Sequence, residues 1–239
     1  MDHEAVDVFA EGLLTVSLGA DWATAASLAT AGGTLVLAIA TFSSIRSANR
    51  SNRVAQEALL VQMRPMLIPS RLSDPVQKIF FQEGKSFRLD GGRGCMEFDD
   101  GQSVVYLALS LRNAGQGISF IHGWRFQAGR EEAHVRPDPS EFRTQGLDLA
   151  IAPDDVGYWE AAFRDDSDRQ FAEAVEAAKT AEQVTIDLLY GDQDGRQRVI
   201  TRILLRRYSP EDPDRPEVWM PAVIRHWNLD RPDPRERDQ

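Results

Sequence analysis

The feature that most constrains this chain is an uncharged stretch between Asp21 and Arg46, WATAASLATAGGTLVLAIATFSSI. As a helix, residues 22–45 would extend about 36 Å at about 1.5 Å per residue, against a bilayer hydrocarbon core of about 30 Å. The strongly apolar side chains give an insertion free energy of only about −2 to −4 kcal/mol, which is marginal. The stretch predicts one transmembrane helix at residues 22–45.

Two other interpretations compete with a membrane span. A helix that is buried in a soluble protein or bound to a partner would also be apolar. A cleaved signal peptide begins with a basic region. That alternative is disfavoured, because residues 2–21 contain five acidic side chains and no Lys or Arg.

The flanking charges predict an orientation for the single span. Arg46, Arg50 and Arg53 follow it, and no basic residue precedes it. Lys and Arg near a span are retained on the cytoplasmic side. We therefore expect a cell-membrane protein with its N-terminus outside and residues 46–239 in the cytoplasm. The same three arginines are candidates for contact with anionic lipid headgroups, at about 1 kcal/mol each.

Small residues recur at helical spacing within the span. Ala25, Ala29 and Gly33 form one stripe. Stripes of this kind allow two helices to approach closely in lipid, although an Ala-rich span also contains them by chance. They are candidates for packing against a second copy of the chain.

The sequence predicts five regions along the chain. They are an acidic N-terminal segment (1–21), the transmembrane helix (22–45), a juxtamembrane stalk helix (46–64), a β domain (65–229) and a disordered tail (230–239). The stalk keeps a helical period until Pro65, which disfavours helical backbone at the residue before it.

Short apolar or alternating runs between turn signals predict strands after Pro65. Residues 103–113 and 117–127 indicate a hairpin, with glycines that permit positive φ in its turn. Residues 183–191 and 197–207 indicate a second hairpin, and 156–163 and 218–225 further strands.

A helix is expected after an N-cap at Ser167, with Phe171, Val175 and Ala178 on one face. Strands in series with one inserted helix predict a mainly β fold. We expect an antiparallel, immunoglobulin-like β-sandwich, with a barrel as the alternative.

Composition excludes some classes of partner. The net charge of −10 argues against a sequence-independent grip on nucleic acid, which needs a basic surface. Cys95 is the only cysteine, so the fold does not depend on an intrachain disulfide. We interpret it as a bystander thiol.

No motif indicates a catalytic centre, a cofactor or a metal. His122 and His226 lack metal-ligand spacing, and structural roles are the simpler interpretation. Asp192 and Asp194 in YGDQDG could contribute to a calcium site, but Asp and Gly are also ordinary hairpin-turn residues. These four residues are the weak ligand candidates of the chain.

The segments MRPMLIPS, LSLRNAGQGISFIHGWRF and LLYGDQDGRQR follow the apolar stretch in this order. With the acidic N-terminus and the single span, they resemble a group of uncharacterised bacterial membrane-anchored proteins. The resemblance covers most of the chain and rests on the LRNxGxG and YGDxDG segments. It implies an architecture, and no activity or site residue.

Three hypotheses for function follow. The leading one is a membrane-tethered cytoplasmic β-sandwich that binds a protein partner or a second copy of itself. The alternative is a ligand- or calcium-binding sensor on a membrane anchor. A hydrolase using His122 or His226 with an Asp is the third. The expected partners are membrane lipid and protein.

Overall fold

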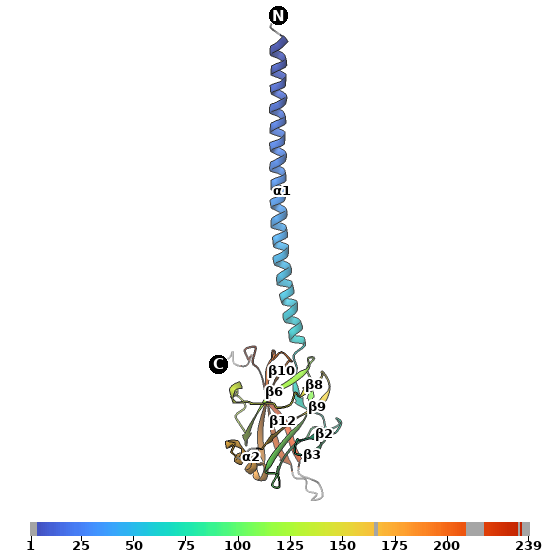
Figure 1. Cartoon of the computed structure of the whole chain (residues 1–239), viewed down its shortest axis with the longest axis vertical. Helices are drawn as coiled ribbons and strands as arrows, with labels where there is room; N and C mark the ends of the chain where they lie inside the picture. Colours follow the sequence, from blue (N-terminus) through green and yellow to red (C-terminus); the bar gives the residue numbers. More distant parts are fainter. Residues whose placement is uncertain (1–3, 165–166, 209–217, 234, 236–239) are drawn as a thin grey trace. The chain divides into compact units, whose positions relative to one another are not determined.

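The computed structural model describes residues 4–164, 167–208, 218–233 and 235. The chain divides into two compact units according to the contacts between its residues, Met1–Ala58 and Leu59–Gln239 (Figure 1). The first is helical, and the second contains the strands.

One uninterrupted helix, α1 (Glu4–Gln62), contains the expected span and the expected stalk. The acidic segment before the span is therefore helical from Glu4 onward. The helix ends shortly before Pro65, whose ring disfavours helical backbone at the preceding residue. A stop at this place is what the sequence predicts.

The Trp22–Gln56 part of α1 is long and apolar enough to cross a membrane, and its side chains are exposed. Hydroxyl groups in this part bond to the helix itself. Thr34 Oγ1 donates to Thr30 O at 2.8 Å, and Thr41 Oγ1 donates to Leu37 O at 2.8 Å. Such bonds satisfy donors that lipid could not satisfy.

The second unit contains short strands and two helical elements. They are β1 (Leu67–Pro69), β2 (Gln77–Phe80), β3 (Ser86–Leu89), β4 (Gly94–Asp99), β5 (Val104–Asn113), β6 (Ser119–Ala128), the 3-10 helix η1 (Pro139–Glu141), β7 (Arg143–Thr144), β8 (Ala150–Ile151), β9 (Val156–Phe163), α2 (Arg169–Thr180), β10 (Gln183–Gly191), β11 (Val199–Tyr208) and β12 (Val218–Asn228).

Ten of these strands form one sheet in the order β1-β5-β4-β12-β11-β10-β6-β7, with β8 on β6 and β9 on β5. The pairings are antiparallel, and β4 meets β12 at one residue pair, Gly94 with Trp219. A mainly β, antiparallel domain is confirmed. The division into two separate sheets of an immunoglobulin-like sandwich is not confirmed, because the hydrogen-bonded strands are continuous.

Strand β5 is buried on both faces. One face joins the main core with β6, β9, β10 and β11, where Leu107 and Ile186 are fully buried. The other face is covered by the β2–β3 hairpin, and Tyr106 packs edge to face on Phe81 with ring centroids 4.7 Å apart. The hairpin therefore forms an outer layer over β5.

The expected hairpin of 103–113 with 117–127 is wrong. β5 pairs with β1, β4 and β9, whereas β6 pairs with β10, β7 and β8. In the connection between them, Asn113 Nδ2 donates to Gly117 O (2.7 Å) and to Ile151 O of β8 (3.0 Å).

Gly115 and Gly117 do not have the positive φ that we expected. They are needed because another stretch of backbone passes against them. A Cβ on Gly117 would lie 1.8 Å from Met63 O, and one on Gly115 would lie 2.3 Å from Arg64 O. The chain that leaves α1 is packed directly on this connection.

The second predicted hairpin is confirmed. β10 and β11 pair from Gln183 with Arg206 to Tyr190 with Val199. In the turn, Asp192 Oδ1 accepts from Arg196 N at 2.6 Å and Gly195 has a φ of 69°.

Helix α2 begins one residue later than predicted. Asp168, and not Ser167, is the N-cap, and its side chain accepts from Gln170 N at 2.9 Å. The buried face is also shifted from the predicted one. Its buried residues are Phe171, Ala174 and Ala177.

Part of the tail expected to be disordered is held on the domain. Asp230 Oδ2 accepts from Arg198 N at 2.6 Å, and Asp233 Oδ2 accepts from Arg225 Nη2 at 3.0 Å. Positions 234 and 236–239 lie outside the described residues.

Candidate functional site

The two candidate histidines lie apart, on β6 and β12, with β10 and β11 between them. His226 Nδ1 lies 2.7 Å from Thr201 Oγ1. The same Oγ1 lies 2.8 Å from Tyr190 OH, which accepts from Leu67 N at 3.0 Å. Burial lowers the pKa of His226 and raises the pKa of Tyr190 to about 12. Thr201 and Tyr190 are fully buried, so this chain of contacts offers no reachable nucleophile.

His122 also has no polar partner that would make it a catalytic group. Its Nε2 is buried and makes no hydrogen bond with a described residue. A general base needs hydrogen-bond reach to its partner, and Nε2 of His122 has no such partner among the described residues.

The aspartates of the β10–β11 turn are engaged in the turn itself. Asp192 accepts from the backbone of Arg196, and Asp194 Oδ2 lies 2.5 Å from Arg196 Nη2. Among the residues that the structure describes, no group of three or more His, Cys, Asp or Glu is placed to hold a metal ion.

The candidates on α1 are exposed. Ala25, Ala29 and Gly33 carry the small-residue stripe, and Arg46, Arg50 and Arg53 follow it on the same helix. Helix packing and headgroup contact therefore stay predictions.

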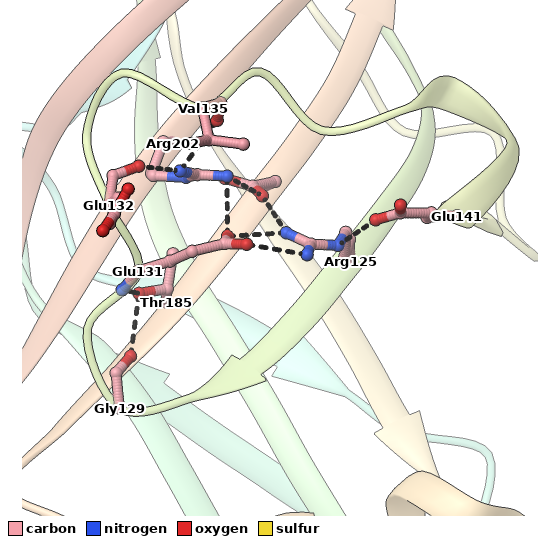
Figure 2. Close-up of polar contacts among 9 residues, drawn as sticks. Arg125, Gly129, Glu131, Glu132, Val135, Glu141, Thr185 and Arg202 are labelled. Atoms are coloured by element: carbon pink, nitrogen blue, oxygen red, sulfur yellow. Dashed lines mark hydrogen bonds and ion pairs between the residues drawn. The ribbon is translucent and has the colours of Figure 1, made fainter.

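A buried ion network lies beneath the loop that follows β6 (Figure 2). Arg202 Nε and Nη2 donate to both oxygens of Asp187, at 2.8 and 2.9 Å. Arg125 Nη1 donates to Asp187 Oδ2 at 2.8 Å. Arg125 also makes two hydrogen bonds to Glu131, at 2.7 and 2.9 Å, and its Nε lies 2.9 Å from Glu141 Oε2.

The remaining donors of Arg202 hold the loop. Nη1 donates to Glu132 O (2.6 Å) and Val135 O (3.1 Å), and Nη2 lies 2.7 Å from Glu131 Oε2. A guanidinium has five N–H donors, and all five are used here. The network has no donor left on Arg202 for a ligand. Its role is to fasten the loop onto β10 and β11.

A cavity of 280 Å³ lies between β9, β7 with its following loop, and the turn after β2. Glu160 of β9 is in its wall and is 7% exposed. The Oε2 atom of Glu160 is buried and makes no hydrogen bond with a described residue. Burial raises the pKa of Glu160, nearby Glu83 raises it further, and Arg164 opposes the shift.

Gln145 and Arg164, which also line this cavity, have partners. Gln145 Oε1 accepts from Trp159 Nε1 at 3.1 Å, and its Nε2 donates to Glu160 O at 3.1 Å. Arg164 forms an ion pair with Glu83. These contacts fix the amide and the guanidinium, whereas Oε2 of Glu160 is a buried acceptor without a described partner.

Arg143 also lines the cavity. Its Nη2 lies 2.6 Å from Asp168 Oδ2, and its guanidinium lies over the ring of Phe163 at 4.8 Å. Among the charged residues that line the cavity, Arg143 is paired with Asp168 and Arg164 with Glu83. Ionised Glu160 is then the charge of the lining without such a pair, which favours a cationic ligand.

Sequence reasoning placed β9 but missed Glu160. The segment VGYWEAAF contains a single charge in an otherwise apolar strand. That charge is the one available signal, since a charged residue is almost never fully buried unless it is paired. Its cavity comes from segments far apart in the chain, and no local pattern reports it.

Comparison with known proteins gives no relative from which this site could be inferred. No family model, no curated protein and no solved structure matches the chain.

Proposed function

We propose that the chain is a membrane-anchored binding module whose Glu160 cavity takes a small ligand with an ammonium or guanidinium group. The observation that carries the proposal is the buried Oε2 of Glu160, which has no described partner and lines a cavity. A buried unpaired acceptor costs about 1–3 kcal/mol, and more when it is charged. A ligand donor would remove that cost.

The size of the cavity limits the ligand. At 280 Å³ it lies just below the range of about 300–1,000 Å³ that is usual for drug-sized ligands. An aliphatic amine fits, with its ammonium on Glu160 and its methylenes against the walls. This is the sensor hypothesis, with Glu160 in place of the turn aspartates.

The anchor belongs to the same proposal. Support for a membrane span comes from the length, apolar composition and exposure of Trp22–Gln56. We keep the orientation suggested by Arg46, Arg50 and Arg53, with the β domain in the cytoplasm. Buried residues of β5 and β9 share the main core with buried residues of β6, β10 and β11. This shared core supports a sandwich-like arrangement, in which the sheet folds over a single core.

A protein partner is the second candidate function. Leu72 and Phe80, near or in the β2–β3 hairpin, are 68% and 70% exposed. Apolar groups exposed on an outer layer are typical of contact surfaces when they are contiguous. A second copy of the chain could use this hairpin or the small-residue stripe of α1.

The test is a titration of the full-length chain in a neutral detergent. Isothermal calorimetry compares putrescine with 1,4-butanediol, which has a similar length and no charge. We expect putrescine alone to bind, and Glu160→Gln to weaken binding by about tenfold or more. Glu173→Gln, an exposed carboxylate on α2, is the matched control and should bind as wild type.

Two results contradict the proposal. One is equal binding of putrescine by wild type and Glu160→Gln. The other is no binding of putrescine, agmatine or methylammonium to the wild-type chain at millimolar concentration. The hairpin hypothesis is tested separately, because Phe80→Ser should lower self-association in analytical ultracentrifugation only if the hairpin is an interface.

A further inference from the structure

Arginines gather at a second cavity, which is separate from the Glu160 site. It has a volume of 450 Å³ and is lined by Arg64, Arg196, Arg198 and Arg231, with Asp230 as the single carboxylate. The whole chain carries a net charge of −10, so its overall composition does not predict a positive cluster of this kind. Clefts lined by one sign of charge concentrate ligands of the other sign.

Two of these arginines, Arg64 and Arg231, repel each other. Burial lowers the pKa of Arg64 and the charge of Arg231 lowers it further, while Asp230 and Tyr190 oppose the shift. Arg64 Nη1 donates to Asn228 Oδ1, a neutral acceptor. Arg231 is exposed and lines the same cavity. An anion placed between them would relieve the repulsion.

The other two arginines have acidic partners but keep donors free. Arg198 Nη2 reaches Asp230 Oδ1 at 3.4 Å, which is a long contact. Arg196 Nη2 lies 2.5 Å from Asp194 Oδ2, and both side chains are largely exposed. Four guanidiniums against these two carboxylates leave the rim of the cavity positive.

Gln197 supplies an independent observation. It is 8% exposed, lines the cavity, and its Oε1 is buried without a hydrogen-bond partner among the described residues. Its φ of 55° is unusual for a residue other than glycine, and such backbone strain is concentrated at functional sites. The oxygen and nitrogen of an amide can exchange places, so this group can accept from a ligand or donate to it.

We propose that this cavity is an anion site that binds a phosphate group. Arginine forks match phosphate oxygens with paired hydrogen bonds, and phosphate can also donate to or accept from Gln197. The phosphate could belong to a soluble molecule or to a lipid headgroup. Arg64 follows the end of α1 at Gln62 by two residues, so the ligand would bind where the anchor helix enters the domain.

The experiment uses the full-length chain in a neutral detergent with inorganic phosphate as the probe, at constant ionic strength. We expect calorimetric binding that Arg231→Gln weakens by about tenfold, because one charge-assisted contact is lost. Arg130→Gln removes an exposed arginine from the loop after β6 and should bind as wild type. Absence of binding to wild type, or equal binding by Arg231→Gln, overturns the proposal.

A second arm distinguishes the sources of phosphate. Hydrogen exchange of residues 195–198 is measured in nanodiscs of phosphatidylcholine, with and without phosphatidylglycerol. Protection by phosphatidylglycerol alone indicates a headgroup, and protection by added phosphate alone indicates a soluble ligand. Protection by neither overturns the proposal. Glu160→Gln should bind phosphate as wild type, so the two proposed sites can fail independently.

Discussion

Glu131 and Glu160 are the same residue type in opposite circumstances. Glu131 accepts two hydrogen bonds from Arg125, and these bonds with the charge of Arg202 lower its pKa. Glu160 has no such donor, and burial raises its pKa. One carboxylate belongs to a closed network beneath a loop, and the other lines an open cavity.

The difference separates a saturated network from a carboxylate with unused bonding capacity. The Arg202 guanidinium has used every donor that it possesses, so a ligand could bind there only by breaking the fold. The buried Oε2 of Glu160 makes no hydrogen bond with a described residue, so its burial costs stability. Under the proposed function, this cost is a trade between stability and function.

The largest effect is expected at the closed network. Arg202→Ala should destabilise the domain by about 3–5 kcal/mol, because it leaves Asp187 buried without its bidentate partner. Urea unfolding of the full-length chain measures the change. Arg206→Ala, an exposed arginine on the same strand, should stay within about 0.5 kcal/mol of wild type. Equal losses for the two variants would show that the network does not stabilise the domain more than an exposed arginine does.

A substitution of Glu160 in the open cavity is expected to raise the stability of the domain, which is the opposite of the effect at the closed network. Glu160→Gln should stabilise the domain at pH 7 by about 1 kcal/mol, because an unpaired buried charge is removed. The pKa of Glu160 is raised above 4.5, so the folded chain holds this proton more tightly than the unfolded chain. Stability therefore falls as the pH rises from 4.5 through the folded pKa, and the advantage of the variant grows over that range.

Glu131 should show the reverse pH dependence. Its pKa is lowered, so its contribution to stability is present above the unfolded pKa and is lost as the pH falls through the folded pKa.

The prediction for Glu160 is tested by urea unfolding of Glu160→Gln and the control Glu173→Gln across pH 4 to 7, which gives the sign of the change in stability. A variant that is less stable than wild type at neutral pH would show that Glu160 has a stabilising partner.

Much of the fold could be predicted because it is encoded locally. The alternation in 103–113 gave β5, and the turn residues between 183–191 and 197–207 gave the β10–β11 hairpin. The separate pairing partners of β5 and β6 could not be predicted, because Met63 and Arg64 pack on the glycines of the connection between the two strands. Contacts of that kind join distant residues and leave no periodic signal.

The sites were less accessible to sequence reasoning than the strands. Arg202 meets Glu131 and Asp187 across two strands and a loop, and spacing along the chain does not report that meeting. Asp192 and His226 were noticed for their chemistry, but the turn and Thr201 occupy them. A residue type identifies what a side chain can do, whereas the unused bonding capacity appears only when all its neighbours are known.

The smallest change in stability is expected for an exposed ion pair, Lys85 with Glu97, whose length is similar to that of the buried Arg202–Asp187 pair. Lys85 Nζ lies 2.6 Å from Glu97 Oε1, yet these side chains are 30% and 46% exposed. Water already solvates both charges, so Lys85→Met should cost less than about 1 kcal/mol, and added salt should reduce even that. Urea unfolding at low and high salt measures both quantities. The pairs of Lys85 and Arg202 have similar lengths and differ in burial. A loss for Lys85→Met as large as that for Arg202→Ala would mean that burial is not what gives the closed network its strength.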